Sequence, residues 1–264
     1  MTTEARSDAW GAGESYERYM GRWSRLVARS FIVWIGPEPG LTWLDVGCGT
    51  GALTGAVLQH CAPGRVIAME PSPGFIRRAR DTTPAANVGW VRADAAALPC
   101  AGGACDLVVA GLAFNFFPDR NGALQEMRRV AKAGGTVAIY VWDYPGVGVG
   151  FMKAFWEAAV ELDPAARDEG PRFDFCVPES LAREFTHAGF ADVQVGSIEI
   201  ESVFADFEDF WLPFTLGAGP APAYYASLAP AQQEALRHGL ETRFGARGRL
   251  AFPARAWTVR GRNP

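Results

Sequence analysis

Between residues 41 and 141, short apolar runs alternate with segments whose apolar positions recur every three or four residues. The runs predict β-strands and the recurring positions predict amphipathic α-helices. The predicted strands are 41–46, 65–69, 88–92, 106–110 and 136–141. Because strands and helices alternate along the chain, the pattern predicts βαβ units, which build a parallel sheet covered by helices on both faces.

Each predicted helix carries its own apolar positions and end signals. The first follows a glycine-rich turn, the second follows a Pro-Ser-Pro turn, and the third follows Asp119 and is closed by Gly134. Their apolar positions are Leu53, Ala56 and Val57, then Phe75, Ile76 and Ala79, then Leu124, Met127 and Ala131.

The ends of the chain have a different pattern. Residues 12–36 predict two helices, and further helices are expected at 150–162, at 179–188 and around Leu236, Leu240 and Phe244. A Pro/Gly/Ala-rich loop is expected at 216–223. Apolar positions from 193 to 200 and from 251 to 262 predict two closing strands.

The sequence LDVGCGTG, at 44–51, joins the first strand to the first helix. Glycines at such a turn let the backbone approach a ligand closely, which indicates a nucleotide-type cofactor. Gly47, Gly49 and Ala52 also satisfy the dinucleotide fingerprint GxGxxA, and Glu70 stands where a ribose-binding acid is expected. Asp45 disfavours a dinucleotide, because its carboxylate would face the negative pyrophosphate in a poorly solvated site.

Three acidic residues follow three successive predicted strands. Asp45 would suit the ammonium group of S-adenosylmethionine, and Glu70 could accept both hydroxyls of a ribose. Asp94 is placed to accept from an adenine amino group. Each acid alone could be a helix cap, a solvated strand end or a turn former. Together they fit one extended adenosyl ligand.

With these motifs the chain resembles the class I S-adenosylmethionine-dependent methyltransferases, and is most similar to the small-molecule branch of ubiquinone and menaquinone biosynthesis. The resemblance covers 41–141. It implies a doubly wound, Rossmann-like α/β fold with a seven-stranded, mostly parallel sheet and a helical substrate cap. The cofactor-binding residues that it implies are Asp45, Gly47, Cys48, Gly49, Glu70, Pro71, Ser72, Asp94, Ala95, Ala110 and Gly111. The backbone carbonyl at Ala110 or Gly111 would receive the cofactor ammonium, and the turn at 134–136 matches the family's turn into the fifth strand.

Aromatic residues supply candidates for a lid and a substrate pocket. Tyr19 is expected to cover the cofactor, in a lid formed by residues 12–24. The expected pocket residues are Tyr16, Trp23, Phe114, Asn115, Phe116 and Trp142. Aromatic faces attract a cation and apolar walls exclude water, but Tyr16, Tyr19 and Trp23 could equally form the buried face of one helix.

A general base is needed only if the methyl acceptor must lose a proton. Asp143 and Tyr144, which follow the fifth strand, are the acid/base candidates. The three histidines, His60, His187 and His238, are expected to be structural or to lie on the surface.

Composition limits the partners of the chain. It has 264 residues, 49% of them hydrophobic, and a net charge of −4, with no run of Lys or Arg longer than a pair, which argues against nucleic acid as the substrate. The N-terminus lacks a signal-peptide layout, and the longest charge-free apolar stretch, 107–118, is well short of the ~20 residues of a membrane span, so a cytoplasmic location is expected. Five cysteines without CxxC spacing support neither a disulfide framework nor a metal site.

The sequence therefore predicts a single methyltransferase domain over 1–264. Its expected parts are lid helices at 1–40, a cofactor core at 41–143, cap insertions at 144–190 and 203–248, and closing strands at 191–202 and 249–264. The expected reaction is in-line methyl transfer from S-adenosylmethionine to a small organic molecule, in a desolvated aromatic pocket of a monomer or homodimer. An NAD-dependent oxidoreductase and a non-catalytic S-adenosylmethionine-binding protein stay open as alternatives.

Overall fold

The computed structural model describes residues 16–168, 170–216 and 219–264, and divides into two compact units. The sheet unit comprises Ser24–Trp142, Phe175–Ile198 and Ala256–Pro264. The aromatic unit comprises Asp143–Asp174, Glu199–Arg255 and the described part of Met1–Trp23. Residues 12–15 of the predicted lid lie outside the described residues.

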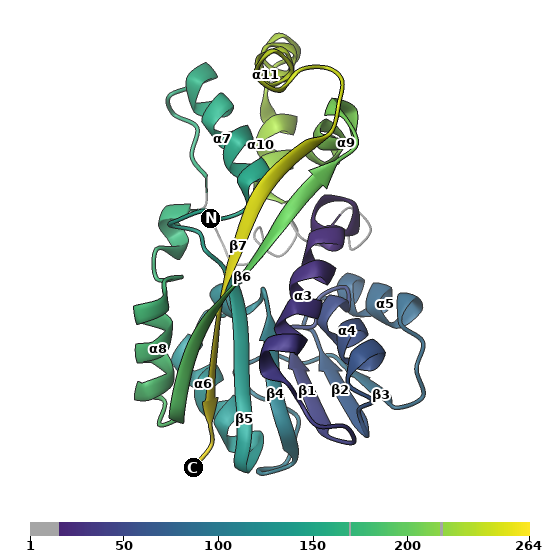
Figure 1. The fold of residues 1–264 in the computed structure, drawn as a ribbon, viewed down its shortest axis with the longest axis vertical. Helices are drawn as coiled ribbons and strands as arrows, with labels where there is room; N and C mark the ends of the chain where they lie inside the picture. Colours follow the sequence, from purple (N-terminus) through teal and green to yellow (C-terminus); the bar gives the residue numbers. More distant parts are fainter. Residues whose placement is uncertain (1–15, 169, 217–218) are drawn as a thin grey trace. The chain divides into compact units, whose positions relative to one another are not determined.

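Seven strands form one sheet in the order β3-β2-β1-β4-β5-β7-β6 (Figure 1). Neighbouring strands from β3 to β5 are parallel, and β7 is antiparallel to β5. The strands are β1 Thr42–Val46, β2 Arg65–Met69, β3 Val88–Val91, β4 Cys105–Gly111, β5 Ala131–Trp142, β6 Ala191–Phe204 and β7 Leu250–Arg262. This confirms the predicted α/β class with a seven-stranded, mostly parallel sheet.

The helices cover both faces of the sheet because the strand order reverses. Right-handed crossovers from β1 through β3 place α4 (Ala52–His60) and α5 (Pro73–Thr82) on one face. The chain then returns to β4 beside β1 and continues the other way, so α6 (Arg120–Val130) lies on the opposite face (Figure 1). The reversal between β1 and β4 is the switch point, where ligands bind at the carboxyl ends of strands.

Local signals set the helix starts in the sheet unit. Ser72 accepts a hydrogen bond from the backbone N–H of Phe75 and caps α5, and Asp119 accepts from the N–H of Gly122 and caps α6. The predicted stop of the third helix at Gly134 is wrong. The helix ends at Val130 and the chain enters β5 directly, because Ala131 already pairs with Cys105 before regular pairing begins at Thr136.

The remaining elements of the sheet unit are α8 (Pro178–His187), the short turn η3 (Phe114–Phe116) and most of α3 (Arg22–Ile35). Helix α8 falls in the stretch predicted as the first cap insertion, and it belongs to the sheet unit. None of the helices in the described part of the chain is long and apolar enough to cross a membrane.

Helices and stacked rings build the aromatic unit. Phe155 stacks on Phe214 with ring centroids 4.4 Å apart, and Phe210 stacks on Phe252 at 5.3 Å. The predicted loop at 216–223 is wrong in its last four residues, because Pro220 starts a helix, as proline does well in a first turn. The helices are η2 Glu17–Gly21, α7 Gly150–Leu162, η4 Gly170–Phe173, α9 Phe207–Trp211, η5 Leu212–Thr215, α10 Pro220–Ser227 and α11 Pro230–Phe244.

Candidate active site

Asp45 lies near the end of β1 and is 1% exposed. Its Oδ2 accepts a hydrogen bond from Oγ1 of Thr54 on α4, over 2.7 Å. Its Oδ1 is buried and has no hydrogen-bond partner among the described residues. Burial raises the pKa of Asp45 from its ordinary 3.8 to about 7, and the nearby charge of Glu70 adds to the rise. A buried oxygen of this kind is costly unless a donor or a cation satisfies it.

Glu70 follows β2 and links two parts of the site. Its Oε2 accepts from the backbone N–H of Gly49 at 3.1 Å, and its Oε1 accepts from the N–H of Ser72 at 2.9 Å. Burial raises the pKa of this carboxyl above its ordinary value. A carboxylate has about four lone-pair positions, so each oxygen keeps capacity for another donor. The two hydroxyls of a ribose match that capacity.

The glycine-rich loop is tight at one end and open at the other. Gly47 has a φ of +73°, and a Cβ there would lie 2.7 Å from the Cβ of Ala113, so only glycine allows this approach to the loop after β4. Gly49 has a φ of +55°, and a Cβ there would meet no atom of the described residues within 4 Å. The open side of Gly49 is therefore available to a ligand.

Cys48, between these glycines, is buried. Burial raises the pKa of its thiol well above the ordinary 9.0, and the charges of Asp45 and Glu70 add to this. The thiol thus stays protonated and is a poor nucleophile, so it contributes a small apolar wall.

The residues predicted beside the adenine have local contacts. Asp94 is exposed, and its Oδ1 accepts from the N–H of Ala96 at 2.9 Å in the turn after β3, while Ala95 is buried. Pro71 is exposed and Ser72 caps α5. These contacts are those of a turn and a cap, and the predicted adenine contacts stay predictions.

At the other side of the switch point, β4 ends at Gly111, beside the fully buried Ala110. The turn after it places Phe114 and Asn115 in buried positions, with Phe116 half-buried. Trp142, at the end of β5, is 5% exposed. The sheet unit thus carries four of the predicted pocket residues, at the carboxyl ends of β4 and β5.

The other predicted pocket and lid residues belong to the aromatic unit. Tyr19 is fully buried and its ring lies 6.1 Å from that of Phe151. Trp23 is 4% exposed and packs edge-on against Phe204 at 5.2 Å. Tyr16 is half-buried. Packing in this unit accounts for the burial of Tyr19 and Trp23, and their roles as lid and pocket stay predictions.

Asp143, the first acid/base candidate, is buried and held by an ion pair. Its Oδ2 accepts hydrogen bonds from Nε and Nη2 of Arg255, at 2.8 and 2.6 Å, and from the backbone N–H of Val147 at 2.9 Å. Tyr144 packs against the ring of Phe173 at 4.5 Å. A base role for Asp143 or Tyr144 stays a prediction. The ion pair shows that Asp143 also has a structural role.

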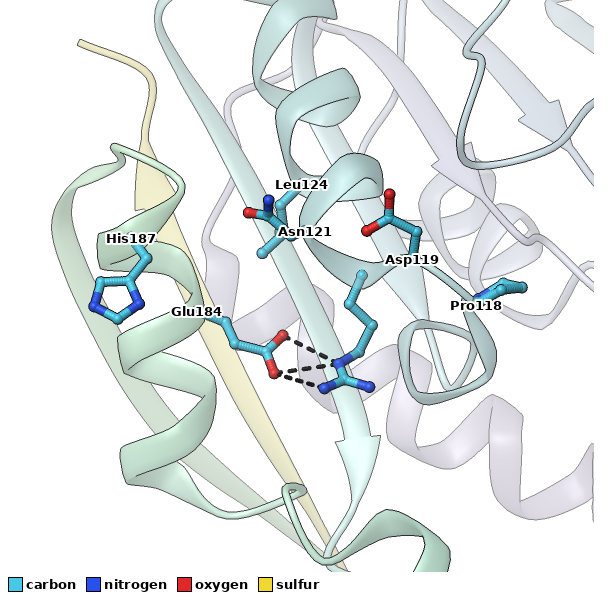
Figure 2. Close-up of a pocket in the computed structure, with 7 residues that line it drawn as sticks. Pro118, Asp119, Asn121, Leu124, Glu184 and His187 are labelled. Atoms are coloured by element: carbon cyan, nitrogen blue, oxygen red, sulfur yellow. Dashed lines mark hydrogen bonds and ion pairs between the residues drawn. The ribbon is translucent and has the colours of Figure 1, made fainter.

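A separate hollow of about 390 Å³ lies between the start of α6 and α8 (Figure 2). Arg120 pairs there with Glu184, at 3.1 Å, and its guanidinium stacks on Phe175 at 3.6 Å. His187 lines the hollow, whereas none of the predicted cofactor-binding residues does. Its strongest charges, those of Arg120 and Glu184, neutralise each other.

Sequence reasoning missed Thr54 and Arg255. Thr54 stands in a helix of ordinary composition, and Arg255 lies 112 residues from its partner Asp143. Neither pairing leaves a signal in the sequence. Within the described residues no group of three or more His, Cys, Asp or Glu side chains could hold a metal ion.

The site suits S-adenosylmethionine on three counts. Among the described residues, Asp45 has a buried oxygen without a donor, Glu70 has two oxygens that can each accept a further hydrogen bond, and the side of Gly49 is open. Two neighbouring carboxylates also favour a ligand that carries positive charge over one that carries phosphate.

Comparison with known proteins defines the class. A family model described as "Methyltransferase domain" matches residues 44–139. Demethylmenaquinone methyltransferase of Staphylococcus aureus (strain JH9) is 31% identical over 179 residues, which cover 62% of this chain and 73% of that protein. The chain belongs to the class I S-adenosylmethionine-dependent methyltransferases, as the resemblance implied, and within them it is similar to this quinone-modifying enzyme.

Two solved structures share the fold. A protein of Anabaena variabilis assigned as a methyltransferase of an antibiotic biosynthesis pathway has a TM-score of 0.59 at 17% identity, covering 88% of this chain and 95% of that one. Phosphoethanolamine N-methyltransferase 2 of Haemonchus contortus, in complex with phosphomonomethylethanolamine and S-adenosylhomocysteine, has a TM-score of 0.56 at 15% identity, covering 96% and 57%.

The predicted reaction class and cofactor are confirmed. The protein is an S-adenosylmethionine-dependent methyltransferase, and neither the NAD-dependent oxidoreductase nor the non-catalytic binding protein is favoured.

Proposed function

We propose that the enzyme methylates a small, largely apolar organic acceptor and holds its cofactor between the carboxyl ends of β1, β2 and β4. This proposal rests on Oδ1 of Asp45, which is buried and has no hydrogen-bond partner within residues 16–168, 170–216 and 219–264. Asp45 would bind the α-ammonium, Glu70 the ribose hydroxyls, and the loop from Gly47 to Gly49 the methionine chain. Asp94 and Ala95, with Pro71 and Ser72, would line the adenine, and the carbonyl of Ala110 or Gly111 would share the ammonium.

When bound, S-adenosylmethionine supplies a methyl group that its positively charged sulfur activates. The chain's own part is to align the acceptor and to exclude water, because an in-line displacement depends on both. In the sheet unit, Phe114, Asn115, Phe116 and Trp142 would form the acceptor side. In the aromatic unit, Tyr16 and Trp23 are the further candidate pocket residues, and Tyr19 is the candidate lid residue. Asp143 or Tyr144 would take a proton only from an acceptor that must lose one.

The acceptor class rests on three observations. The predicted pocket is made almost wholly of aromatic side chains, which suit an apolar ring. The similar Staphylococcus aureus enzyme is named for demethylmenaquinone, which makes a quinol or phenol ring the first acceptor to test. The net charge of −4 supports a small molecule over a nucleic acid. We further propose a cytoplasmic enzyme that acts as a monomer or homodimer.

Calorimetry with S-adenosylmethionine, S-adenosylhomocysteine and NAD tests the cofactor site. We expect both sulfur ligands to bind and NAD to leave no heat of binding. Turnover is then measured as S-adenosylhomocysteine released with a panel of demethylated quinols, phenols and amines. Release only with a polar amine would contradict the proposed acceptor class, and absence of binding by both sulfur ligands would contradict the site.

A further inference from the structure

Tyr140 of β5 lies on the same face of the sheet as Asp45. Asp45 of β1 pairs with Val109 of β4, which pairs with Ala138 of β5. Residues side by side in a sheet share a face, and so do alternate residues along one strand. Tyr140, two residues beyond Ala138, therefore faces the side on which Asp45 meets α4.

The ring of Tyr140 occupies the place where a side chain of residue 111 would stand. Gly111 pairs with Tyr140, and a Cβ on Gly111 would lie 2.5 Å from the hydroxyl oxygen and 2.7 Å from Cζ. Because β4 stands between β5 and β1, a ring that crosses Gly111 directs its hydroxyl toward β1 and the glycine-rich loop. The ring is 1% exposed and packs against Phe31 of α3 at 4.6 Å, so its direction is fixed.

The backbone of Tyr140 also shapes the turn at the end of β4. Its carbonyl accepts a hydrogen bond from the N–H of Leu112 at 2.8 Å. Leu112 has a φ of +54°, a left-handed conformation that a leucine rarely adopts. Such strained positions cluster at ligand sites, and this one follows the carbonyls proposed to receive the cofactor ammonium.

We propose that Tyr140 is a binding residue for the amino-acid end of S-adenosylmethionine, where its hydroxyl adds a third polar group to the Asp45 carboxylate and the β4 carbonyls. This inference rests on the proposed cofactor site. It also explains the glycine at 111, since any larger residue would displace the ring that carries the hydroxyl.

The test compares two ligands in calorimetry with Tyr140→Phe. S-adenosylhomocysteine carries the amino-acid end, whereas 5′-methylthioadenosine keeps the adenosyl group and lacks the ammonium and carboxylate. Loss of one hydrogen bond should raise the Kd of S-adenosylhomocysteine about fivefold and leave that of 5′-methylthioadenosine unchanged. Tyr225→Phe, which removes a tyrosine hydroxyl from the aromatic unit, is the matched control and should change neither Kd.

Equal weakening of both ligands would assign Tyr140 a purely structural role and overturn the proposal, as would an unchanged Kd for S-adenosylhomocysteine. If the unmodified protein binds neither sulfur ligand, the cofactor site itself fails, and that result is distinct from a failure at Tyr140. A double-mutant cycle of Gly111→Ala with Tyr140→Leu provides a second measurement. The alanine should lower stability less in the leucine background, and additive effects would contradict the contact.

Discussion

Thr54 donates a hydrogen bond to one carboxylate oxygen of Asp45, and the other oxygen is buried with no donor in the part of the chain that the structure describes. The proposed ligand for that oxygen is the cofactor ammonium, which prefers the ionised carboxylate. Because the pKa of Asp45 is raised to about 7, the affinity for S-adenosylmethionine should increase as the pH rises from 6 to 8. Asp45→Asn should lower the affinity about 10- to 100-fold and flatten this dependence. Calorimetry across that pH range measures both, and an Asn variant with the full pH dependence would contradict the assignment.

The Asp45 carboxyl group should make the stability of the ligand-free protein decrease with pH, whereas it should make the affinity for the cofactor increase with pH. The folded-state pKa of Asp45 lies above its ordinary value, so the protonated form favours the fold. Its contribution to stability is complete below about pH 3.8 and is lost as the pH rises through about 7. Urea unfolding without ligand should therefore show the free energy of unfolding of the unmodified protein falling, between pH 5 and 8, relative to that of Asp45→Asn. If the free energies of unfolding of the two proteins have the same pH dependence, the raised pKa of Asp45 is contradicted.

Glu70 should act on the adenosyl end of the cofactor. Glu70→Gln replaces an acceptor-only carboxylate by an amide that can accept at one atom only. We expect a loss of about tenfold or more in affinity for both S-adenosylhomocysteine and 5′-methylthioadenosine, measured by calorimetry. Asp45→Asn, by contrast, should weaken the first ligand alone. If Glu70→Gln weakens S-adenosylhomocysteine and leaves the affinity for 5′-methylthioadenosine unchanged, Glu70 does not bind the adenosyl end of the cofactor.

The ion pair between Asp143 and Arg255 should stabilise the aromatic unit. Asp143 is almost fully buried, and its partner's side chain is about a quarter exposed. Arg255→Ala leaves a buried carboxylate without its guanidinium, so we expect a loss of about 1–3 kcal/mol in the free energy of unfolding, less than for a fully buried pair. Arg249→Ala breaks an exposed pair with Glu201 and should cost at most about 1 kcal/mol. Equal losses in the two variants would contradict a larger contribution of the buried pair to stability.

The variant Asp143→Asn distinguishes two roles of Asp143, that of a general base and that of a structural residue. If Asp143 is a base, Asp143→Asn should leave cofactor affinity unchanged and lower turnover only with acceptors that release a proton. A structural anchor should lower thermal stability and reduce turnover with every acceptor alike. Turnover with a phenol and with a neutral amine, together with the melting temperature, decides between the two roles.

The strands of the parallel core could be predicted closely because each is a short apolar run bounded by turn residues. Four of the five predicted core strands agree with the structure to within one residue at either end. β5 starts five residues earlier than predicted, because Ala131 pairs with Cys105 ahead of an irregular stretch that contains two glycines. The start of such a strand depends on its pairing with a neighbouring strand, and the sequence of one strand does not show that pairing.

The residues of the proposed cofactor site differ in how far the sequence indicates them. Asp45 and Glu70 are candidates from the sequence because each stands in a local motif at a strand end. Thr54 and Tyr140 reach the site through helix packing and strand register, so their own neighbours in sequence give no signal. Their helical spacing predicts that Tyr19 and Trp23 are buried. It does not predict whether their rings pack in a core or contact a ligand, because both roles require the same side chains.

The place of β7 between β5 and β6 has a consequence for synthesis of the chain. When β6 leaves the ribosome, its neighbour in the sheet has not yet been made, and β5 presents an open edge. Both strands gain this neighbour only when residues 250–262 have been translated. The aromatic unit waits as well, since three separate stretches of chain contribute to it. Chains that stop before residue 250 therefore expose unpaired strand edges and many aromatic rings, which makes them the species that chaperones and proteases should recognise.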